Sequence, residues 1–332
     1  MADIAITTEL QEIQNNLWGT NVRENIALAL EKLQNLPEEP NTIQGSLKNS
    51  KLSLLKVSIQ NMENTLQSRK DQLDRIKARL EQASGRTILQ YGKCGNDVYY
   101  AICDDGEAAL YGTGATYDYT FHDSVFYQNG QIKKIVLSNG ITGLGDRLFY
   151  HCANAETVSL PATLTSIGDS AFAQEDAVIN DTAGLTSVTI PQAVTAIQSF
   201  AFQHTAIAEV TVPANVKTWG KYVFSDCTKL KTARIACDSI GSFAFTRCTA
   251  LSNLTISANC KTFGQNMLTY CESLTAITYE GTIDQWNAIT KPVNWMSSGE
   301  HSYNNYLKKI QCVDGYLEYD SENNVWNEVK NG

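Results

Sequence analysis

Residues 240–248, Ile240-Gly241-Ser242-Phe243-Ala244-Phe245-Thr246-Arg247-Cys248, decide the fold of this chain, because their pattern returns along the sequence. An apolar residue opens each unit, often with glycine next. A ring stands five residues later, and a cysteine often stands eight residues later. The opening residues are Phe121, Leu144, Ile167, Ile197, Trp219, Ile240 and Phe263, spaced 23, 23, 30, 22, 21 and 23 residues apart. The fifth-position residues are Phe126, Phe149, Phe172, Phe202, Phe224, Phe245 and Leu268.

A period of this length predicts a solenoid. One unit cannot bury its own apolar face, whereas stacked units share a continuous Phe/Leu/Ile core. Short alternating stretches such as 158–160 and 210–212 are expected to align as a parallel sheet. The eighth-position residues are expected to be small side chains in a tight turn rather than reactive thiols. They are Cys152, Cys227, Cys248 and Cys271, with Thr205 in the same slot.

The unit resembles the BspA-type leucine-rich repeat, most clearly in residues 240–248 and in Ile167-Gly168-Asp169-Ser170-Ala171-Phe172. The flanks agree: residues 94–98 and 112–119 resemble the β-rich segment that often precedes these repeats, and residues 280–289 and 312–315 resemble the closing segment. The resemblance spans about residues 86–316. It implies a solenoid used for adhesion, without catalytic chemistry.

The outward positions of the predicted strands form a candidate binding row. The row runs through Val136, Ser159, Thr189, Thr211, Arg234, Thr255 and Thr278, and the candidate ligand-binding residues in it are Thr189, Thr211, Arg234 and Thr255. Hydroxyl-rich side chains can hydrogen-bond a glycan. The same composition also suits ordinary solvated strands, since Thr favours pleated surfaces.

Two further places are candidates for ligand binding. The third unit carries extra residues within 174–184, including Glu175, Asp176 and Asp181, and insertions in solenoids often carry function; no spacing there supports calcium binding. The C-terminal end is rich in aromatic residues, of which Trp295, Tyr303 and Tyr306 offer rings for sugar stacking. The alternative for these rings is a cap over the last repeat.

The N-terminal residues predict a short helical hairpin. Thr8 and Gln11 form a capping box, and Gly19 ends the first helix. The stretch resembles a leader of tail and fibre proteins from phages of Gram-positive hosts, although Asn25 stands where Ala is usual. The resemblance implies attachment to the virion through Leu10, Ile13, Leu17, Trp18, Val22, Arg23 and Ile26. Without it, the residues describe a helical hairpin and nothing more.

Residues 52–83 carry a heptad pattern of about four and a half repeats, which predicts a coiled coil. The predicted oligomerisation residues are Leu52, Leu55, Ile59, Met62, Leu66, Leu73, Ile76 and Leu80. Leu at a with Ile at d in the last heptads favours more than two strands, and the phage resemblance favours a homotrimer. The alternative is one helix packed on its own globular domain.

The expected fold class is therefore mixed: an α-helical hairpin and coiled coil, followed by a β-rich leucine-rich-repeat solenoid. The expected domains are a virion-attachment module (1–45), a stalk (46–85), a β-rich lead-in (86–120), about seven repeats (121–282) and a C-terminal cap (283–332).

Composition narrows the function. A net charge of −9 argues against nucleic-acid binding, and no apolar run is long enough to enter a membrane as a spanning helix. No signal peptide is visible at the start. The nine cysteines lack any C-x-x-C pair and the four histidines share no ligand spacing, so we expect reduced thiols, no metal and no cofactor.

We therefore expect a non-enzymatic phage tail-fibre or baseplate protein that binds a host cell-surface glycan or protein through oligomeric repeat heads. Its other partners would be tail or baseplate proteins, and its location the virion after synthesis in the host cytoplasm. A bacterial surface adhesin is the first alternative. A carbohydrate-active enzyme is the second, since a pair of carboxylates can meet in space without a sequence signature.

Overall fold

The computed structural model describes residues 53–54, 56–61, 63–65, 67–68, 71, 74–75, 77–78, 81, 85–174, 183–296, 306–323 and 325–331. The chain divides into two compact units, Met1–Ile88 and Leu89–Gly332. Each is described by itself below. Within the described part of the chain, every helix is too short or too polar to span a bilayer.

The described residues of the first unit between positions 53 and 81 are helical. Ile59 is half-buried there, and Lys77 pairs with Glu81 one turn later, at 3.7 Å. The other seven predicted seam residues and all predicted virion-attachment residues lie outside the described residues. The helical hairpin and the coiled coil therefore stay predictions.

The second unit begins with three strands, β1 (Ile88–Lys93), β2 (Gly95–Cys103) and β3 (Glu107–Thr116). Strands β2 and β3 are antiparallel, and β3 then pairs in parallel with two later strands, β4 (Lys134–Leu137) and β5 (Ile141–Leu144). The strand β3 therefore carries the antiparallel lead-in over into the parallel repeats.

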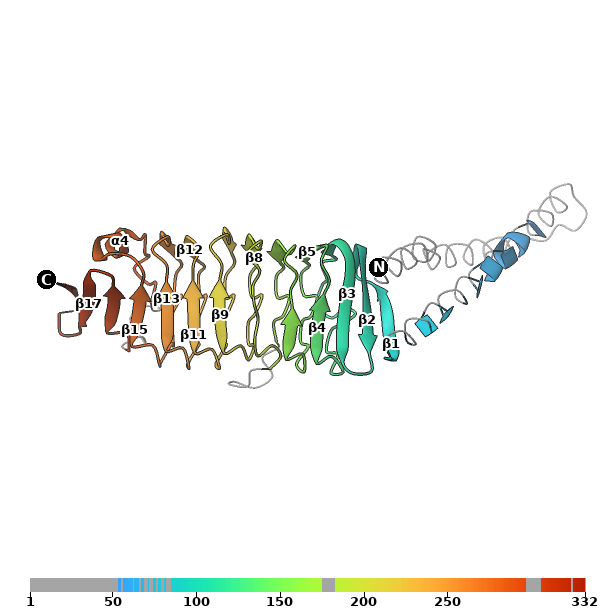
Figure 1. Cartoon of the computed structure of the whole chain (residues 1–332), viewed down its shortest axis with the longest axis horizontal. Helices are drawn as coiled ribbons and strands as arrows, with labels where there is room; N and C mark the ends of the chain where they lie inside the picture. The colour runs from blue at the N-terminus through green and yellow to red at the C-terminus, as the bar shows by residue number, and fades with distance from the viewer. Residues whose placement is uncertain are drawn as a thin grey trace, which may run out of the picture. The chain divides into compact units, whose positions relative to one another are not determined.

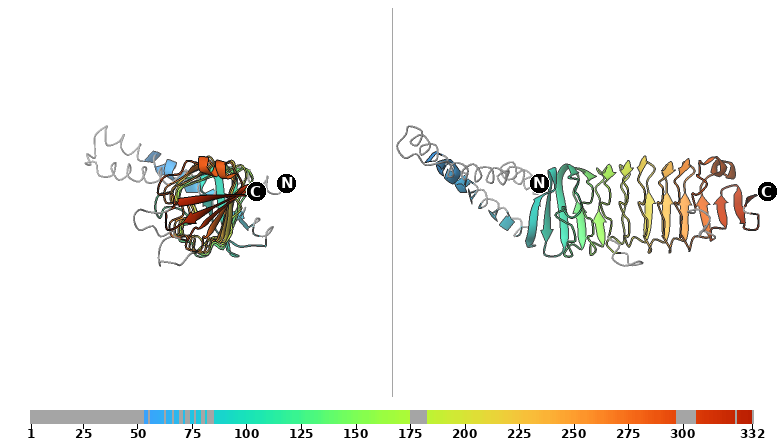
Figure 2. Two further views of the ribbon diagram at one scale, coloured as in Figure 1. Left: turned by 90° about the vertical axis from the view of Figure 1, so that its left-hand side faces the viewer. Right: turned by 180° about the vertical axis from the view of Figure 1, so that it is seen from behind.

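Each following repeat except the third contributes a longer and a shorter strand, and the strands follow one another in chain order along the unit (Figure 1). The longer strands are β4, β6 (Thr157–Ser159), β9 (Glu209–Val212), β11 (Thr232–Ile235), β13 (Asn253–Ile256) and β15 (Ala276–Tyr279). The shorter strands are β5, β7 (Ser166–Ile167), β8 (Ala196–Ile197), β10 (Thr218–Trp219), β12 (Ser239–Ile240) and β14 (Thr262–Phe263). Seen end-on, the coils superimpose (Figure 2).

The longer strands pair in parallel and in register, as the repeats predict. Arg234 lies opposite Thr211 on one side and Thr255 on the other. Glu209–Val212 alternates exposed and buried residues, which sends every second side chain into the core. The solenoid part of the predicted fold is therefore confirmed.

The core contains a column of stacked rings from five consecutive repeats. Phe149 and Phe172 stack at 5.6 Å between centroids, and the stack continues through Phe202, Phe224 and Phe245 at 5.5, 5.2 and 5.8 Å. These rings are buried. The spacing of the predicted fifth positions thus sets the core.

The third repeat departs from the predicted pattern. Its expected strand at 187–189 is not a regular strand: Ser187 makes one isolated bridge to Thr157, and the sheet divides between β6 and β9. The break follows the segment 174–184, the extra length that distinguishes this repeat. On the other side of the coil β7 and β8 remain paired, so the break is confined to the longer strands.

The first repeat also departs. Phe121 does not open a unit, because it lies in a turn and is 60% exposed. The pairing partner of β5 is instead β3, through Ala115 and Gly143. The sequence alignment therefore places the start of the first repeat wrongly. Phe126 keeps its core position, and residues 117–123 follow β3 without forming a strand.

The C-terminal end closes the core with different elements. Helix α4 (Ile283–Ala288) starts at a capping box between Thr282 and Gln285 and buries Ile283 and Trp286. Strand β16 (Lys309–Cys312) adds to β15 in parallel, and β17 (Gly315–Asp320) and β18 (Val325–Lys330) then turn antiparallel.

Candidate binding surfaces

The outward row of the longer strands is a solvent-facing surface, here called the strand face. Register aligns Thr211, Arg234, Thr255 and Thr278 on consecutive strands. Thr211 and Thr278 are exposed, and Arg234 forms an ion pair with Glu280. The side-chain hydrogen bond to Glu280 raises the pKa of Arg234, so this cation is held charged on the face. The arrangement offers hydroxyls and one fixed ion pair to a ligand.

The other predicted site residues fall in different places. Thr189 is exposed but lies in the repeat that lacks a regular longer strand. Glu175, Asp176, Asp181 and Tyr303 lie outside the described residues. The structure therefore brings only Thr211, Arg234 and Thr255 together on paired strands.

The two described rings of the C-terminal candidates differ in exposure. Trp295 is buried, at 8% exposure, and packs against Phe263 and Trp286 at 5.3 and 6.1 Å between centroids. Such burial fits the cap alternative, since a sugar needs an accessible ring face. Tyr306 is 46% exposed.

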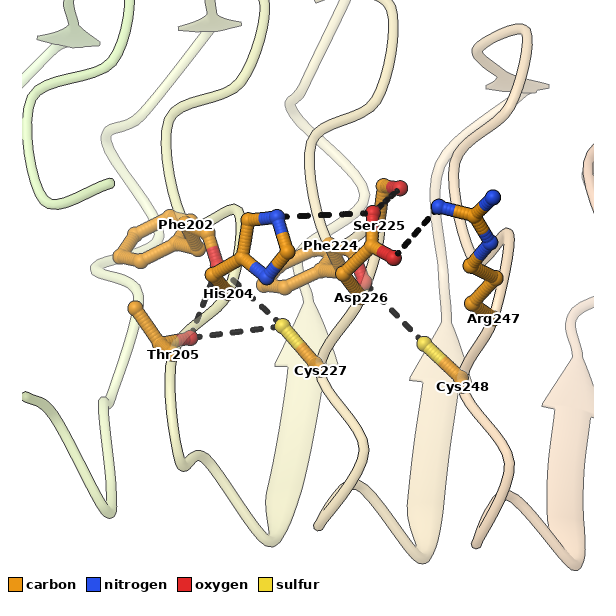
Figure 3. A network of polar contacts seen from close by, with 9 residues as sticks. All are labelled: Phe202, His204, Thr205, Phe224, Ser225, Asp226, Cys227, Arg247 and Cys248. Carbon is orange, nitrogen blue, oxygen red and sulfur yellow. Dashed lines mark hydrogen bonds and ion pairs between the residues drawn. The ribbon is translucent and has the colours of Figure 1, made fainter. Parts of the chain in front are cut away.

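A charged network crosses three consecutive repeats (Figure 3). Asp226, only 8% exposed, lies between His204 Nε2 at 3.9 Å and Arg247 Nη1 at 3.4 Å, and Ser225 donates a hydrogen bond to its carboxylate. A buried carboxylate needs such partners, because an unpaired one costs several kcal/mol. The network therefore ties neighbouring repeats together.

Sequence reasoning missed this network because it treated the histidines as scattered. The signal is positional: His204, Asp226 and Arg247 each stand seven residues after the first residue of their unit. All three have positive φ, at 58°, 62° and 59°, so the same turn recurs at each. Stacking the repeats superimposes the turns and brings the three side chains into one line.

The repeat cysteines form a second interior column. The Cys227 thiol donates to the carbonyl oxygen of Phe202 in the preceding repeat at 3.2 Å, and Cys248 does the same to Phe224 at 3.1 Å (Figure 3). Thr205 fills the equivalent slot, but its hydroxyl donates to the carbonyl oxygen of Phe202 in its own repeat, at 2.8 Å. The cysteine bonds therefore join neighbouring repeats, whereas the threonine bond stays within one repeat.

These thiols are not poised for chemistry. All nine cysteines of the chain are buried. Burial raises the pKa of Cys152, Cys227 and Cys271 to about 12, and raises that of Cys248 well above its usual value. These thiols are therefore protonated near neutral pH. Because a thiol must ionise to act as a nucleophile, they are poor nucleophiles there. Among the residues that the structure describes, no three His, Cys, Asp or Glu side chains gather as a metal site.

The stacked coils, parallel strands and ring column define a leucine-rich-repeat solenoid. The BspA type leucine rich repeat region matches this chain in six copies, over residues 119–180 and 175–290. Together these matches cover more than half of the 332 residues. The chain belongs to this repeat family, which confirms the resemblance seen in the repeats; the sequence predicts about seven units where six copies match.

Solved structures with similar folds are leucine-rich-repeat proteins as well. One from Eubacterium ventriosum is 20% identical, with 64% of this chain and 75% of that one covered and a TM-score of 0.36. One from T. pallidum is 18% identical, with 56% and 87% covered and a TM-score of 0.39. One from Bacteroides ovatus is 15% identical, with 68% and 76% covered and a TM-score of 0.34. No curated protein matches the chain.

Proposed function

We propose that this protein is a phage tail-fibre or baseplate receptor-binding protein whose repeat solenoid attaches the virion to a bacterial surface. The observation that carries the binding part of the proposal is the strand face, where Thr211, Arg234 and Thr255 align on paired strands. A rigid solenoid holds these groups in place before a ligand arrives, which lowers the entropy cost of binding.

The phage part rests on the N-terminal sequence. The leader resembles those of tail and fibre proteins. The heptads of residues 52–83 favour more than two strands, and the phage resemblance favours a trimer. Three weakly binding heads on one stalk gain a high effective concentration once one head is engaged. Weak contacts to a glycan or a surface protein would then be enough to hold a virion.

Membership of the BspA-type repeat family is the observation behind a second candidate, a bacterial surface adhesin. The two candidates share the strand face and differ in where the protein is found. Mass spectrometry of purified virions and of cell-envelope fractions separates them: presence in virions supports the first, and presence in the envelope alone contradicts it.

The binding face is tested with a matched pair of variants. Thr211→Ala with Thr255→Ala removes two hydroxyls from the strand face. Thr218→Ala with Thr262→Ala removes two from the shorter strands β10 and β14, where both residues are exposed. At about 1 kcal/mol for each hydrogen bond, we expect the first pair to weaken binding to host cells by about 30-fold. The second pair should bind like the unchanged protein, and equal losses in both pairs would contradict the proposal.

The stalk is tested through the solution mass of the full chain by light scattering. Ile59→Glu with Leu66→Glu places charges at two predicted seam positions, whereas Gln60→Glu with Gln67→Glu places them one residue further on. We expect a trimer for the unchanged protein and the second pair, and a monomer for the first pair. A monomeric unchanged protein would remove the stalk from the proposal.

A further inference from the structure

Aromatic side chains gather on the turns at the start of the repeats, between β3 and β6. They are Phe121, His122, Tyr127, Tyr150 and His151, here called the aromatic cluster. Phe121 is 60% exposed and His122 is exposed, while the other three are half-buried. A contiguous exposed patch of large rings marks a surface for interaction more often than scattered single residues do.

The rings support one another. Tyr127 and Tyr150 are nearly parallel, with 15° between their planes and 6.0 Å between centroids. His122 lies 4.6 Å from Tyr127, and Phe121 meets Tyr150 edge-on at 6.0 Å. Side chains already held by their neighbours lose little rotational freedom when a ligand binds.

Arg147 fixes the most exposed ring. Its guanidinium carbon lies 4.5 Å from the centroid of Phe121, a cation–π contact. The same guanidinium bonds to Asp169 Oδ1 at 3.4 Å and donates to the carbonyl oxygen of Tyr119 at 3.3 Å. Charged hydrogen-bonding groups therefore border the aromatic cluster.

Packing of the repeats does not require these rings. Tyr127 and Tyr150 occupy one position of the recurring turn, where the amide donates to the carbonyl group three residues earlier. The same position holds small or polar residues in the later repeats: Ala173, Gln203, Ser225, Thr246 and Thr269. The solenoid thus forms without an aromatic residue at this position in the later repeats.

We propose that the aromatic cluster is a binding site for oligosaccharides of β-1,4-linked pyranoses with the gluco configuration. Sugars of this class carry equatorial hydroxyls, so both faces of each ring expose C–H groups that stack on aromatic rings. Their hydroxyls point outward, where the tyrosine hydroxyls, the histidine nitrogens and the Arg147–Asp169 pair offer partners. This site lies on the turns and is separate from the strand face.

The test is isothermal titration calorimetry of the full chain with two probes, chitotetraose and cellotetraose. We expect at least one probe to bind, and Phe121→Ala to weaken that binding by about tenfold or more. Phe121→Tyr keeps the ring and should keep the affinity. Phe243→Ala removes a half-buried ring from a separate outer stack, where it lies 4.4 Å from Tyr222, and should leave the affinity unchanged.

A second variant guards against misfolding. Tyr150→Ser installs the residue that another repeat carries at the same turn position, in Ser225, so the fold is expected to tolerate it. It should also weaken binding of the probe. Melting curves establish that each variant is folded.

Binding of neither probe, or binding that Phe121→Ala and Tyr150→Ser leave unchanged, would overturn the proposal. The strand-face pair Thr211→Ala with Thr255→Ala distinguishes this failure from failure of the proposed function. Loss of probe binding in that pair alone would assign the sugar to the strand face and not to the aromatic cluster. Unchanged probe binding in that pair is the result expected here.

Discussion

The interior of the solenoid and its strand face follow the same repeat but differ in how closely they keep it. Inside, consecutive repeats place a phenylalanine at the same position, with ring centroids 5.2 to 5.8 Å apart from Phe149 to Phe245. Outside, the aligned row changes from Thr211 to Arg234 to Thr255. What repeats is what stacking requires, and what varies is free to serve binding.

The third repeat sharpens this comparison. Its longer strand is lost from the sheet, yet Phe172 and Phe202 still stack at 5.5 Å on either side of the extra residues. The ring column therefore tolerates a break in the strand ladder. Dispersion and burial inside the column, together with the pairing of β7 with β8, keep this repeat in the stack.

The largest effect expected from the interior is loss of stability at high pH. Burial raises the pKa of Cys152, Cys227 and Cys271 to about 12, against 9.0 for an ordinary thiol, and raises the pKa of Cys248 well above that value. Below pH 9 they are protonated both in the folded and in the unfolded chain. Between pH 9 and 12 the unfolded chain releases their protons and the folded chain does not, so stability falls as the pH rises.

Each buried thiol contributes about 1.4 kcal/mol per pH unit to this loss, and the four repeat thiols together on the order of 5 kcal/mol per pH unit. Urea unfolding at pH 7.5, 9 and 10.5 under reducing conditions measures it. In the Cys248→Ala variant, the free energy of unfolding should fall less steeply with pH, by the contribution of one thiol. A flat stability between pH 9 and 10.5 would mean that the thiols are not held away from water.

The second prediction compares two phenylalanines of neighbouring repeats. Phe224 is fully buried in the column, whereas Phe243 is half-buried in an outer stack, 4.4 Å from Tyr222. Phe224→Ala leaves a cavity and should cost about 4 kcal/mol. Phe243→Ala loses one partly exposed ring contact and should cost about 1 kcal/mol. Urea denaturation at pH 7.5 measures both costs. Similar costs would contradict the view that the inner ring column contributes more to stability than the outer stack.

The sequence predicts the interior well, because each interior position obeys a rule that acts in every repeat. The rings, the cysteine slot and the parallel strands follow from the period alone. Phe121 is the exception: the count of residues places it at a unit start, but the lead-in strand β3 already fills that place through Ala115. A spacing rule cannot tell where the first true coil begins.

The surface is less predictable because its contacts join residues that no local pattern connects. The row of Thr211, Arg234 and Thr255 follows from register, but the ion pair from Arg234 to Glu280 does not. The aromatic cluster likewise joins Phe121 to Tyr150 across two turns. Such side chains meet only after the repeats have stacked, so their contacts cannot be predicted from a local sequence pattern.

The third prediction concerns the cysteine column. Cys248→Ala removes a buried thiol that donates to the carbonyl oxygen of Phe224, and should cost about 1.5 kcal/mol at pH 7.5. Cys248→Thr should cost less, because Thr205 shows that this slot accepts a threonine, whose hydroxyl donates to the phenylalanine carbonyl of its own repeat. Unfolding of both variants in urea compares them. A Thr variant less stable than the Ala variant would show that volume, and not the hydrogen bond, sets the cost of this position.

The smallest effect on stability is expected on the strand face. Thr211 is exposed and its neighbours in the row are themselves variable, so Thr211→Ala with Thr255→Ala should change the free energy of unfolding by less than about 0.5 kcal/mol per site. The same pair is expected to weaken binding to cells, whereas Phe243→Ala should lower stability and leave the binding of folded protein unchanged. Measuring both properties in both variants therefore tests whether the repeated interior and the varied surface act independently. If the strand-face pair lowers stability as much as Phe243→Ala does, the threonines help to hold the coils together. The interior and the strand face would then not contribute separately to stability and binding.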